Sequence, residues 1–382
     1  MKRTLLMVLA GAAVFAAALA VAGGGVGVEV PLGLPPVPIP DDNPQTPAKI
    51  ALGDKLYNEL RFSTDGEVGC VTCHEPAKAF TDSPLKVSEG IEKKTGTRNA
   101  PTVVNSAYYT TQFWDGRSPD LEDQALHPFI NPVEHGLASH DPILEIVRTD
   151  PEYVAAFKEV FGVTGEDITM REVTLAIAAF ERTVVSGNSP FDRWFFAGDD
   201  GALTEQQKRG YDLFVNEGRC VSCHVIEQTQ ALFTDNRFHN IGVGINDIQN
   251  DVPELVASFL EADLTLSEVD VEVLTDPRTS EIGRFAITHG FDDLGSFKTP
   301  TLRNIALTAP YMHDGSIETL EEVVIHYLNG GVTEAGDPVN DFLSGGIRPL
   351  NIEMEDVEDL VAFMEALTSP EIAAQLEAAE AE

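Results

Sequence analysis

Two copies of one short pattern dominate this sequence: Cys70-Val71-Thr72-Cys73-His74 and, 150 residues later, Cys220-Val221-Ser222-Cys223-His224. The pattern C-x-x-C-H is the attachment signature of haem c. Two thiols at this spacing bond the two vinyl groups of one porphyrin, and the adjacent imidazole reaches the iron. These are the only four cysteines in the sequence. The sequence therefore predicts two covalently bound haem groups, with His74 and His224 as iron ligands.

Other uses of paired cysteines fit this sequence less well. A thioredoxin-like C-x-x-C needs no histidine after it. A zinc site built from two C-x-x-C pairs usually has them much closer together in the chain. Structural disulfides in a secreted protein need no such motif. Two haem c groups therefore remain the preferred interpretation.

Residues 1–22 combine Lys2 and Arg3 with an apolar run that ends in small residues. This pattern is typical of a secretory signal peptide, with cleavage after Ala20 or Ala22. An uncleaved anchor is the alternative, because the apolar run is near the lower length of a membrane span. Haem c is attached outside the bacterial cytoplasm, so the leader and the haem motifs together predict a periplasmic protein. No stable membrane insertion is expected after cleavage.

The charge of the chain is strongly one-sided, with 62 acidic and 25 basic residues and a formal net charge of −37. Nucleic acid is therefore excluded as an expected partner, because phosphate binding needs a basic surface. A basic redox protein would be attracted to such a surface. A general adaptation for solubility explains the charge equally well. Hydrophobic residues make up 43% of the chain, which is enough for a sizeable core.

Helical patterns prevail along the chain, and strand-like alternation is scarce. Thr46-Pro47 is typical of a helix start, and this helix is expected to run toward Tyr57. Thr169 and Glu172 form a capping box for the clearest helix, from Asp167 to Val185. The sequence predicts a mainly α fold with two cytochrome-c-like domains, each with one covalently bound haem c.

The expected organisation has five parts: a signal peptide (1–22), a Pro-rich lead-in (23–45), an N-terminal haem c domain (46–190), a C-terminal haem c domain (191–369) and a tail (370–382). Residues 246–280 are acidic and weakly periodic, which predicts a surface insertion of the second domain. The Ala/Glu-rich tail is expected to be loose. Apart from the haem motifs, the two domains show little internal repeat.

Several further strings resemble the bacterial di-haem cytochrome c peroxidase and MauG superfamily, in order and with suitable spacing. They are Gly96-Thr97-Arg98-Asn99-Ala100-Pro101-Thr102, Phe113-Trp114-Asp115-Gly116-Arg117, Asn131-Pro132-Val133-Glu134, Phe297-Lys298-Thr299-Pro300-Thr301-Leu302-Arg303-Asn304 and Ala309-Pro310-Tyr311-Met312-His313-Asp314-Gly315. The resemblance implies a peroxidase whose N-terminal haem reacts with hydrogen peroxide. Its C-terminal haem passes electrons from a small cytochrome, a cupredoxin or another partner protein. A homodimer is one assembly that the resemblance allows.

The resemblance also implies catalytic residues around the first haem. Glu134 is the expected distal acid/base, because cleavage of an O–O bond needs a proton moved from one oxygen to the other. Judged without the resemblance, Glu134 is an ordinary surface carboxylate of an acidic protein. Gln124 and Pro128 match the lining of the same pocket. Trp114 matches a tryptophan between the two haems that relays electrons, whereas Trp194 is expected to be a core residue.

A calcium site between the domains is a further implication of the resemblance. Asn99 and the backbone carbonyls of Thr308 and Pro310 match its ligands. Oxygen-only ligands suit this hard cation. Composition alone does not predict calcium.

The chain departs from the reductively activated peroxidases at two positions. Ile91 stands where those proteins have a histidine that blocks the reactive iron, so the first haem is expected to be open, although His127 and His135 are near in sequence. Tyr327 stands where they have the methionine ligand of the second haem. MauG-like members have a tyrosine at this position, and an anionic phenolate favours oxidised iron. The alternatives to Tyr327 as ligand are Met312, Met354 and His326.

Three functions therefore remain open from the sequence. The preferred one is a MauG-like peroxidase, in which the diferric enzyme reacts with peroxide and shares two oxidising equivalents between the haems. A conventional cytochrome c peroxidase, activated by reduction, is the nearest alternative. A non-enzymatic electron carrier or redox sensor would require both irons to be closed, which Ile91 argues against. His239 is assigned no chemistry.

Overall fold

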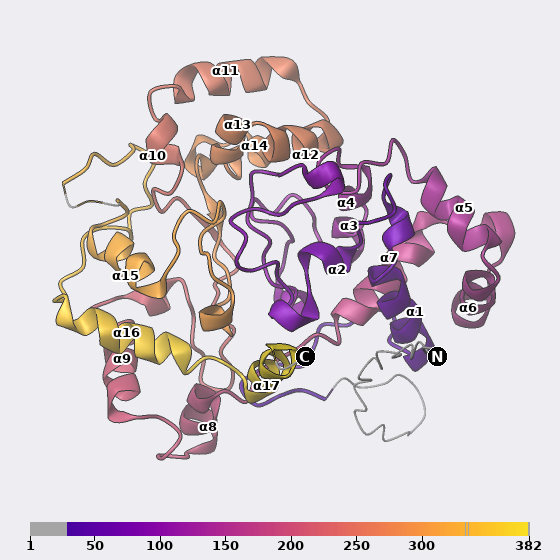
Figure 1. Ribbon diagram of the computed structural model, residues 1–382. Helices are drawn as coiled ribbons and strands as arrows, with labels where there is room; N and C mark the ends of the chain where they lie inside the picture. The colour runs from indigo at the N-terminus through magenta and orange to yellow at the C-terminus, as the bar shows by residue number, and fades with distance from the viewer. Residues whose placement is uncertain (1–28, 333, 335, 381–382) are drawn as a thin grey trace, which may run out of the picture.

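The computed structural model describes residues 29–380 except residues 333 and 335. The expected signal peptide (1–22) lies outside the described residues. None of the helices in the described part of the chain is long and apolar enough to cross a membrane. The fold is mainly helical, as predicted, and its two halves lie side by side (Figure 1).

The N-terminal half is organised around two helices that cross at a glycine. Helix α1 (Pro47–Tyr57) begins with Thr46 as its cap, as predicted, and packs against α7 (Met170–Glu181). A Cβ atom on Gly53 would lie 1.9 Å from the carbonyl oxygen of Ala176, so only glycine permits this approach. Helix α7 is shorter than the predicted 167–185 at both ends: Thr169 caps its start, and Arg182 is the residue that ends it. The other helices of this half are α2 (Cys70–Cys73), α3 (Leu121–Gln124), α4 (His127–Ile130), α5 (Asp141–Thr149) and α6 (Pro151–Phe161).

The C-terminal half repeats this arrangement. Helix α9 (Glu205–Val215) packs against α16 (Glu355–Glu365), and a Cβ atom on Gly210 would lie 1.9 Å from the carbonyl oxygen of Asp359. Helices α8 (Pro190–Ala197) and α15 (Leu320–Leu328) complete its core. The crossing of a glycine-bearing helix with a second helix is thus common to both halves.

A second repeat joins residues 101–118 and 300–317, offset by 199 positions. Each segment has an asparagine in the left-handed region (Asn105, φ 66°; Asn304, φ 61°), followed by a 3₁₀ turn. Each then closes with an isolated bridge, Gln112 with Ser118 and Tyr311 with Ile317. The repeat is also present in the sequence, where six of the eighteen positions are identical: Pro101 and Pro300, Thr102 and Thr301, Asn105 and Asn304, Ala107 and Ala306, Asp115 and Asp314, and Gly116 and Gly315. The expectation of little internal repeat beyond the haem motifs was therefore wrong.

Strand structure is scarce in the described residues, as predicted. Strands β1 (Phe238–His239) and β2 (Phe297–Lys298) form a two-stranded antiparallel sheet. The short 3₁₀ helices are η1 (Leu60–Phe62), η2 (Pro76–Lys78), η3 (Ile91–Lys93), η4 (Ser106–Tyr108), η5 (Gly165–Asp167), η6 (Cys220–Ser222), η7 (Phe291–Asp293) and η8 (Ile305–Leu307).

Residues 245–288 form more than the predicted surface insertion. Helices α10 (Ile245–Ile248), α11 (Val252–Ala262), α12 (Leu266–Thr275), α13 (Pro277–Glu281) and α14 (Phe285–Thr288) form a cap at the top of Figure 1. The cap has an apolar cluster of its own, against which Val133 of the N-terminal half packs. Its outer helix α11 is partly exposed, whereas α12 places Leu274 in the wall of the first cavity described below.

The tail is not loose where the structure describes it, so that expectation was wrong. Residues Pro370–Glu380 form helix α17, and Ile372 is buried in a cluster with Val103 and Val104. The amide of Gln375 donates a hydrogen bond to the carbonyl of Pro76 (3.1 Å). The C-terminal helix is therefore docked on the N-terminal half.

Candidate active site

The first cavity brings the N-terminal haem motif together with the predicted catalytic residues. Helix α2 places Cys70 and Cys73 in its wall, and His74 follows directly. The Nδ1 atom of His74 lies 3.3 Å from the carbonyl oxygen of Phe80. This contact fixes the ring through Nδ1 and leaves Nε2 for an iron atom, as is usual for metal-ligating histidines. The cavity therefore has the donor set that a covalent haem needs.

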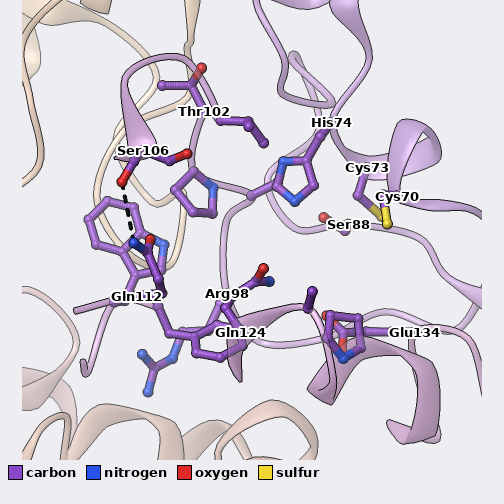
Figure 2. Close-up of a pocket in the computed structure, with 18 of the residues that line it drawn as sticks. Cys70, Cys73, His74, Ser88, Arg98, Thr102, Ser106, Gln112, Gln124 and Glu134 are labelled. Atoms are coloured by element: carbon purple, nitrogen blue, oxygen red, sulfur yellow. Dashed lines mark hydrogen bonds between the residues drawn. The ribbon is translucent and has the colours of Figure 1, made fainter. Parts of the chain in front are cut away.

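Glu134 and Gln124 lie across this cavity from His74 (Figure 2). Pro128 also lines the cavity. Burial raises the pKa of the Glu134 carboxyl to about 8; the nearby charge of Asp270 adds to this effect, and Arg117 opposes it. Glu134 is therefore a half-buried carboxyl group with a raised pKa, unlike the ordinary surface carboxylate considered above.

Ile91 offers no ligand to this cavity. It is 5% exposed, and its backbone nitrogen donates a hydrogen bond to the carbonyl oxygen of Glu134 (2.9 Å). His127 is directed to Asp123, at 3.3 Å. His135 does line the cavity, with its Nδ1 2.9 Å from the carbonyl oxygen of Phe62, and burial lowers its pKa to about 4. Of the two histidines noted near Ile91, His135 therefore lines the cavity and His127 does not.

The second cavity contains the C-terminal haem motif and measures about 640 Å³, within the usual range of cofactor sites. Cys220, Cys223 and His224 line it, and Nδ1 of His224 lies 2.9 Å from the carbonyl oxygen of Phe233. The contact matches that of His74 with Phe80. Both phenylalanines have positive φ values, 52° for Phe233 and 57° for Phe80. The histidines of the two haem motifs are thus oriented by the same kind of contact, although the first motif forms an α-helix and the second a 3₁₀ helix.

Tyr327, on α15, lines the second cavity, and burial raises the pKa of its phenol. Of the alternative ligands, Met354 is 55% exposed on the surface. His326 places its Nε2 2.9 Å from the carbonyl oxygen of Ile241 and is absent from the cavity lining. Met312 lines the cavity together with Tyr327. The structure therefore reduces the four candidates to these two.

The two cavities share one wall. Eight residues line both of them: Asn99, Ala100, Pro101, Thr102, Tyr109, Trp114, Lys298 and Pro300. Trp114 is one of them and so lies between the two candidate haem sites, the position that the resemblance implies for it. Trp194 packs instead against Phe191 and Tyr211 in the C-terminal half, as expected for a core residue.

The three predicted calcium residues lie together in this region. Asn99, Thr308 and Pro310 line the second cavity. The amide nitrogen of Asn99 donates to the carbonyls of Leu85 and Lys86 (3.4 and 3.1 Å), which orients its Oδ1 atom away from them. One side-chain oxygen and two backbone carbonyls are a donor set that suits calcium.

His239 is held by Asp235, with Nε2 2.8 Å from Oδ2. Together with Cys223 these residues have ligand atoms within 4.8 Å of one another. The sulfur of Cys223 belongs to the haem signature, and as a thioether it would no longer be a thiolate ligand for another metal. The group is therefore part of the second haem pocket.

Two charged residues that line these cavities, Arg117 and Lys298, and one that binds Arg117, Asp270, were not expected from the sequence. Arg117 is 8% exposed and lines the first cavity, where it is paired with Asp270 and Asp115. Lys298 is 7% exposed in the shared wall, with Nζ 2.9 Å from the carbonyl oxygen of Thr111 and 3.8 Å from the ring centre of Tyr109. Arg117 and Lys298 stand within the quoted family strings, which could have indicated them. Asp270 stands in an acidic stretch and gave no signal.

This chain is similar to known proteins of one family. A model of the di-haem cytochrome c peroxidase family matches residues 47–201. The cytochrome-c peroxidase IdrP1 of Denitromonas iodatirespirans is 39% identical over 374 residues, covering 97% of this chain and 94% of that protein. The methylamine utilization protein MauG of Methylorubrum extorquens is 36% identical, covering 87% and 81%.

Solved structures show the same fold. A MauG-like protein associated with microbial copper homeostasis has a TM-score of 0.72 and 31% sequence identity, with 91% of this chain and 97% of that chain covered. The di-haem peroxidase BthA of Burkholderia thailandensis has a TM-score of 0.66 at 23% identity, with 90% and 96% covered.

Proposed function

We propose that this chain, which belongs to the di-haem cytochrome c peroxidase and MauG family, reduces hydrogen peroxide at its N-terminal haem site. Membership makes the protein a haem peroxidase that uses haem c. The finer assignment is that electrons enter through the C-terminal haem, from a protein donor or a protein substrate. One observation supports it most directly: Glu134 and Gln124 face His74 across a cavity whose wall, at Trp114, also lines the second haem site.

The side chains have separate roles in this proposal. Bound haem supplies the iron that binds peroxide and exchanges electrons. Glu134 accepts a proton from one peroxide oxygen and returns it to the other, so that peroxide, two electrons and two protons give two water molecules. Gln124 and Pro128 shape the pocket around Glu134. His74, fixed by the carbonyl of Phe80, holds the iron on the opposite side.

We infer that the enzyme is MauG-like rather than reductively activated. Ile91 cannot ligate iron, and its loop is tied to the backbone of Glu134. Tyr327 would ligate the second haem as a phenolate, which favours oxidised iron. The conventional cytochrome c peroxidase stays the second candidate because Met312 lines the same cavity.

Three further assignments belong to the proposal. The haem-bearing domains span 46–190 and 191–369, with peroxide reduced in the first. Calcium binds to the side chain of Asn99 and to the backbone carbonyls of Thr308 and Pro310. The protein is exported to the periplasm, where haem c is attached and where a small cytochrome, a cupredoxin or another partner can reach it.

The test uses the diferric holoprotein and stoichiometric peroxide without a reductant, followed by haem absorbance and low-temperature EPR. Prompt loss of both ferric signals is expected. A diferric protein that stays inert, and reacts only after one-electron reduction, would instead assign it to the reductively activated peroxidases. Inertness in both redox states would contradict peroxide reduction itself.

A further inference from the structure

Asp270 belongs to the C-terminal half, yet its carboxylate is bound by two residues of the N-terminal half. Its Oδ1 atom accepts a hydrogen bond from Nε of Arg117 (2.8 Å), and its Oδ2 atom accepts one from Nδ2 of Asn131 (3.0 Å). Asp270 is 3% exposed and Asn131 is fully buried. Helix α12, which contains Asp270, lies in the cap at the top of Figure 1. A charge buried this deeply would be costly without these partners.

Asn131 begins the turn that presents Glu134 to the first cavity. Its carbonyl oxygen accepts hydrogen bonds from the backbone nitrogens of Glu134 (3.3 Å) and Gly136 (2.8 Å). Its side-chain oxygen accepts one from the backbone nitrogen of Val133 (3.1 Å). The remaining polar atom of the side chain, Nδ2, is the one that donates to Asp270. Asp270 is therefore hydrogen-bonded to the residue around which this turn is built.

The charges around Glu134 come from both halves. Arg117 is shared between Asp270 and Asp115, whose carboxylate oxygens both lie 3.0 Å from Nη1. Arg98 adds a weaker contact to Asp115, at 4.0 Å. Asp270 raises the pKa of Glu134 and Arg117 lowers it, in addition to the larger effect of burial. His135, which follows Glu134, is buried and its pKa is lowered to about 4, so it adds no charge at neutral pH.

We propose that Asp270 is a positioning residue for Glu134: the cap of the C-terminal half, through this carboxylate, fixes the turn that presents Glu134 to peroxide and supplies the negative charge beside it. The role rests on the proposed function, because Glu134 needs positioning only if peroxide is cleaved in the first cavity. Helix α12 makes a second contribution to the same cavity through Leu274, one turn after Asp270.

The substitution Asp270→Asn removes the charge and keeps the shape. The repulsion by Asp270, which raises the pKa of Glu134, is then lost while the attraction by Arg117 remains, so Glu134 should lose its proton at lower pH. A shift of about one to two pH units is expected, which is the size that a close charge produces at a buried site. Glu272→Gln is the matched control, because it removes a half-buried charge from the same helix without touching Arg117 or Asn131.

Two readouts in the full holoprotein test the role. The first is the infrared band of the Glu134 carboxyl group, which is identified by its absence from Glu134→Gln. It is titrated between about pH 5 and 9, the range in which raised carboxyl pKa values fall. The second is the pH profile of the peroxide reaction. In Asp270→Asn both should move to lower pH together, and in Glu272→Gln neither should move. Should Asp270→Asn fail to fold with haem bound, Asp270→Glu replaces it: displacing the charge by one methylene should still shift the band.

The outcomes separate this role from the proposed function. If the wild-type protein reduces peroxide but the band of the Asp270 variant titrates as in the wild type, the positioning role is overturned and the function stands. If the wild-type protein does not reduce peroxide at all, the proposed function fails and this role fails with it. A joint shift of band and pH profile, absent from the control, supports the role.

Discussion

The indole nitrogen of Trp114 donates a hydrogen bond to the backbone carbonyl of Asn99 (2.9 Å). This contact joins the proposed electron relay to the proposed calcium ligand, within the wall that both cavities share. The backbone carbonyl of Trp114 in turn accepts a hydrogen bond from the backbone nitrogen of Lys298 (2.7 Å). Trp114 is thus held from both sides, which restricts the ring to one position between the haem sites.

Trp114→Phe should therefore uncouple the two haem sites. The substitution removes the hydrogen bond to Asn99 and leaves a carbonyl group unpaired, at a cost of about 1–3 kcal/mol in the free energy of unfolding. Covalent haem content should stay at two per chain. After peroxide addition, EPR should show loss of the first ferric signal with little change in the second. Equal loss of both signals would exclude Trp114 as the relay.

Glu134→Gln should lower the rate of peroxide reduction by about 10²- to 10⁴-fold, the usual contribution of a positioned acid/base. Glutamine keeps the size of the side chain and cannot accept the proton. In the wild-type protein the rate should increase as the pH rises through about 8, because the carboxylate that accepts the proton forms above its pKa. This pH dependence should be missing from the variant. Stopped-flow kinetics with matched haem content measures both effects.

A rate that Glu134→Gln leaves unchanged would contradict the assigned role. Glu92→Gln provides the comparison. Its carboxylate is paired with Lys94 at the surface and its side chain is 70% exposed, so its loss should leave the rate unaltered.

Tyr327→Met should raise the reduction potential of the second haem. A thioether ligand raises this potential, whereas a phenolate stabilises the oxidised iron. Potentiometric titration followed by absorbance measures the change, and the ferric EPR signal of that haem should change as well. A potential and spectrum equal to those of the wild type would exclude Tyr327 as the ligand and leave Met312 as the remaining candidate of the four named from the sequence.

The sequence predicted those features that depend only on residues close together in the chain, such as helix caps and haem attachment motifs. The caps at Thr46 and Thr169 each form with the expected side-chain contact. The two haem motifs are local in the same way, since each needs only five consecutive residues. Trp114 was placed through its family string, and the shared wall of the two cavities agrees with that placement.

Features that depend on distant residues were not predictable in this way. The hydrogen bond between Asn131 and Asp270 spans 139 positions, and nothing in the acidic stretch marks Asp270 as buried. The docking of α17 depends on Pro76, which is 299 positions before Gln375. Contacts between residues so far apart in the chain produce no periodic pattern in the sequence from which they could be predicted.

Lys298→Met should change how the stability of the protein depends on pH. Burial lowers the pKa of Lys298 from 10.5 to about 7, while the charge of Asp115 acts in the opposite direction. Between these two pH values the unfolded chain binds a proton that the folded chain does not, so the wild-type protein should gain stability as the pH rises from 7. The gain is at most about 1.4 kcal/mol per pH unit. Methionine cannot titrate, so the variant should lack this contribution.

The measurement is the free energy of unfolding of both proteins at several pH values above and below 7. Relative to the wild type, Lys298→Met should be most favourable at low pH, where lysine must keep its charge in the shared wall. The advantage should shrink as the pH rises, because neutral lysine costs less to bury and keeps its hydrogen bond to Thr111 (2.9 Å). Lys93→Met is the control, since that side chain is 85% exposed. A constant difference between Lys298→Met and the wild type at all pH values would show that Lys298 keeps its charge when folded.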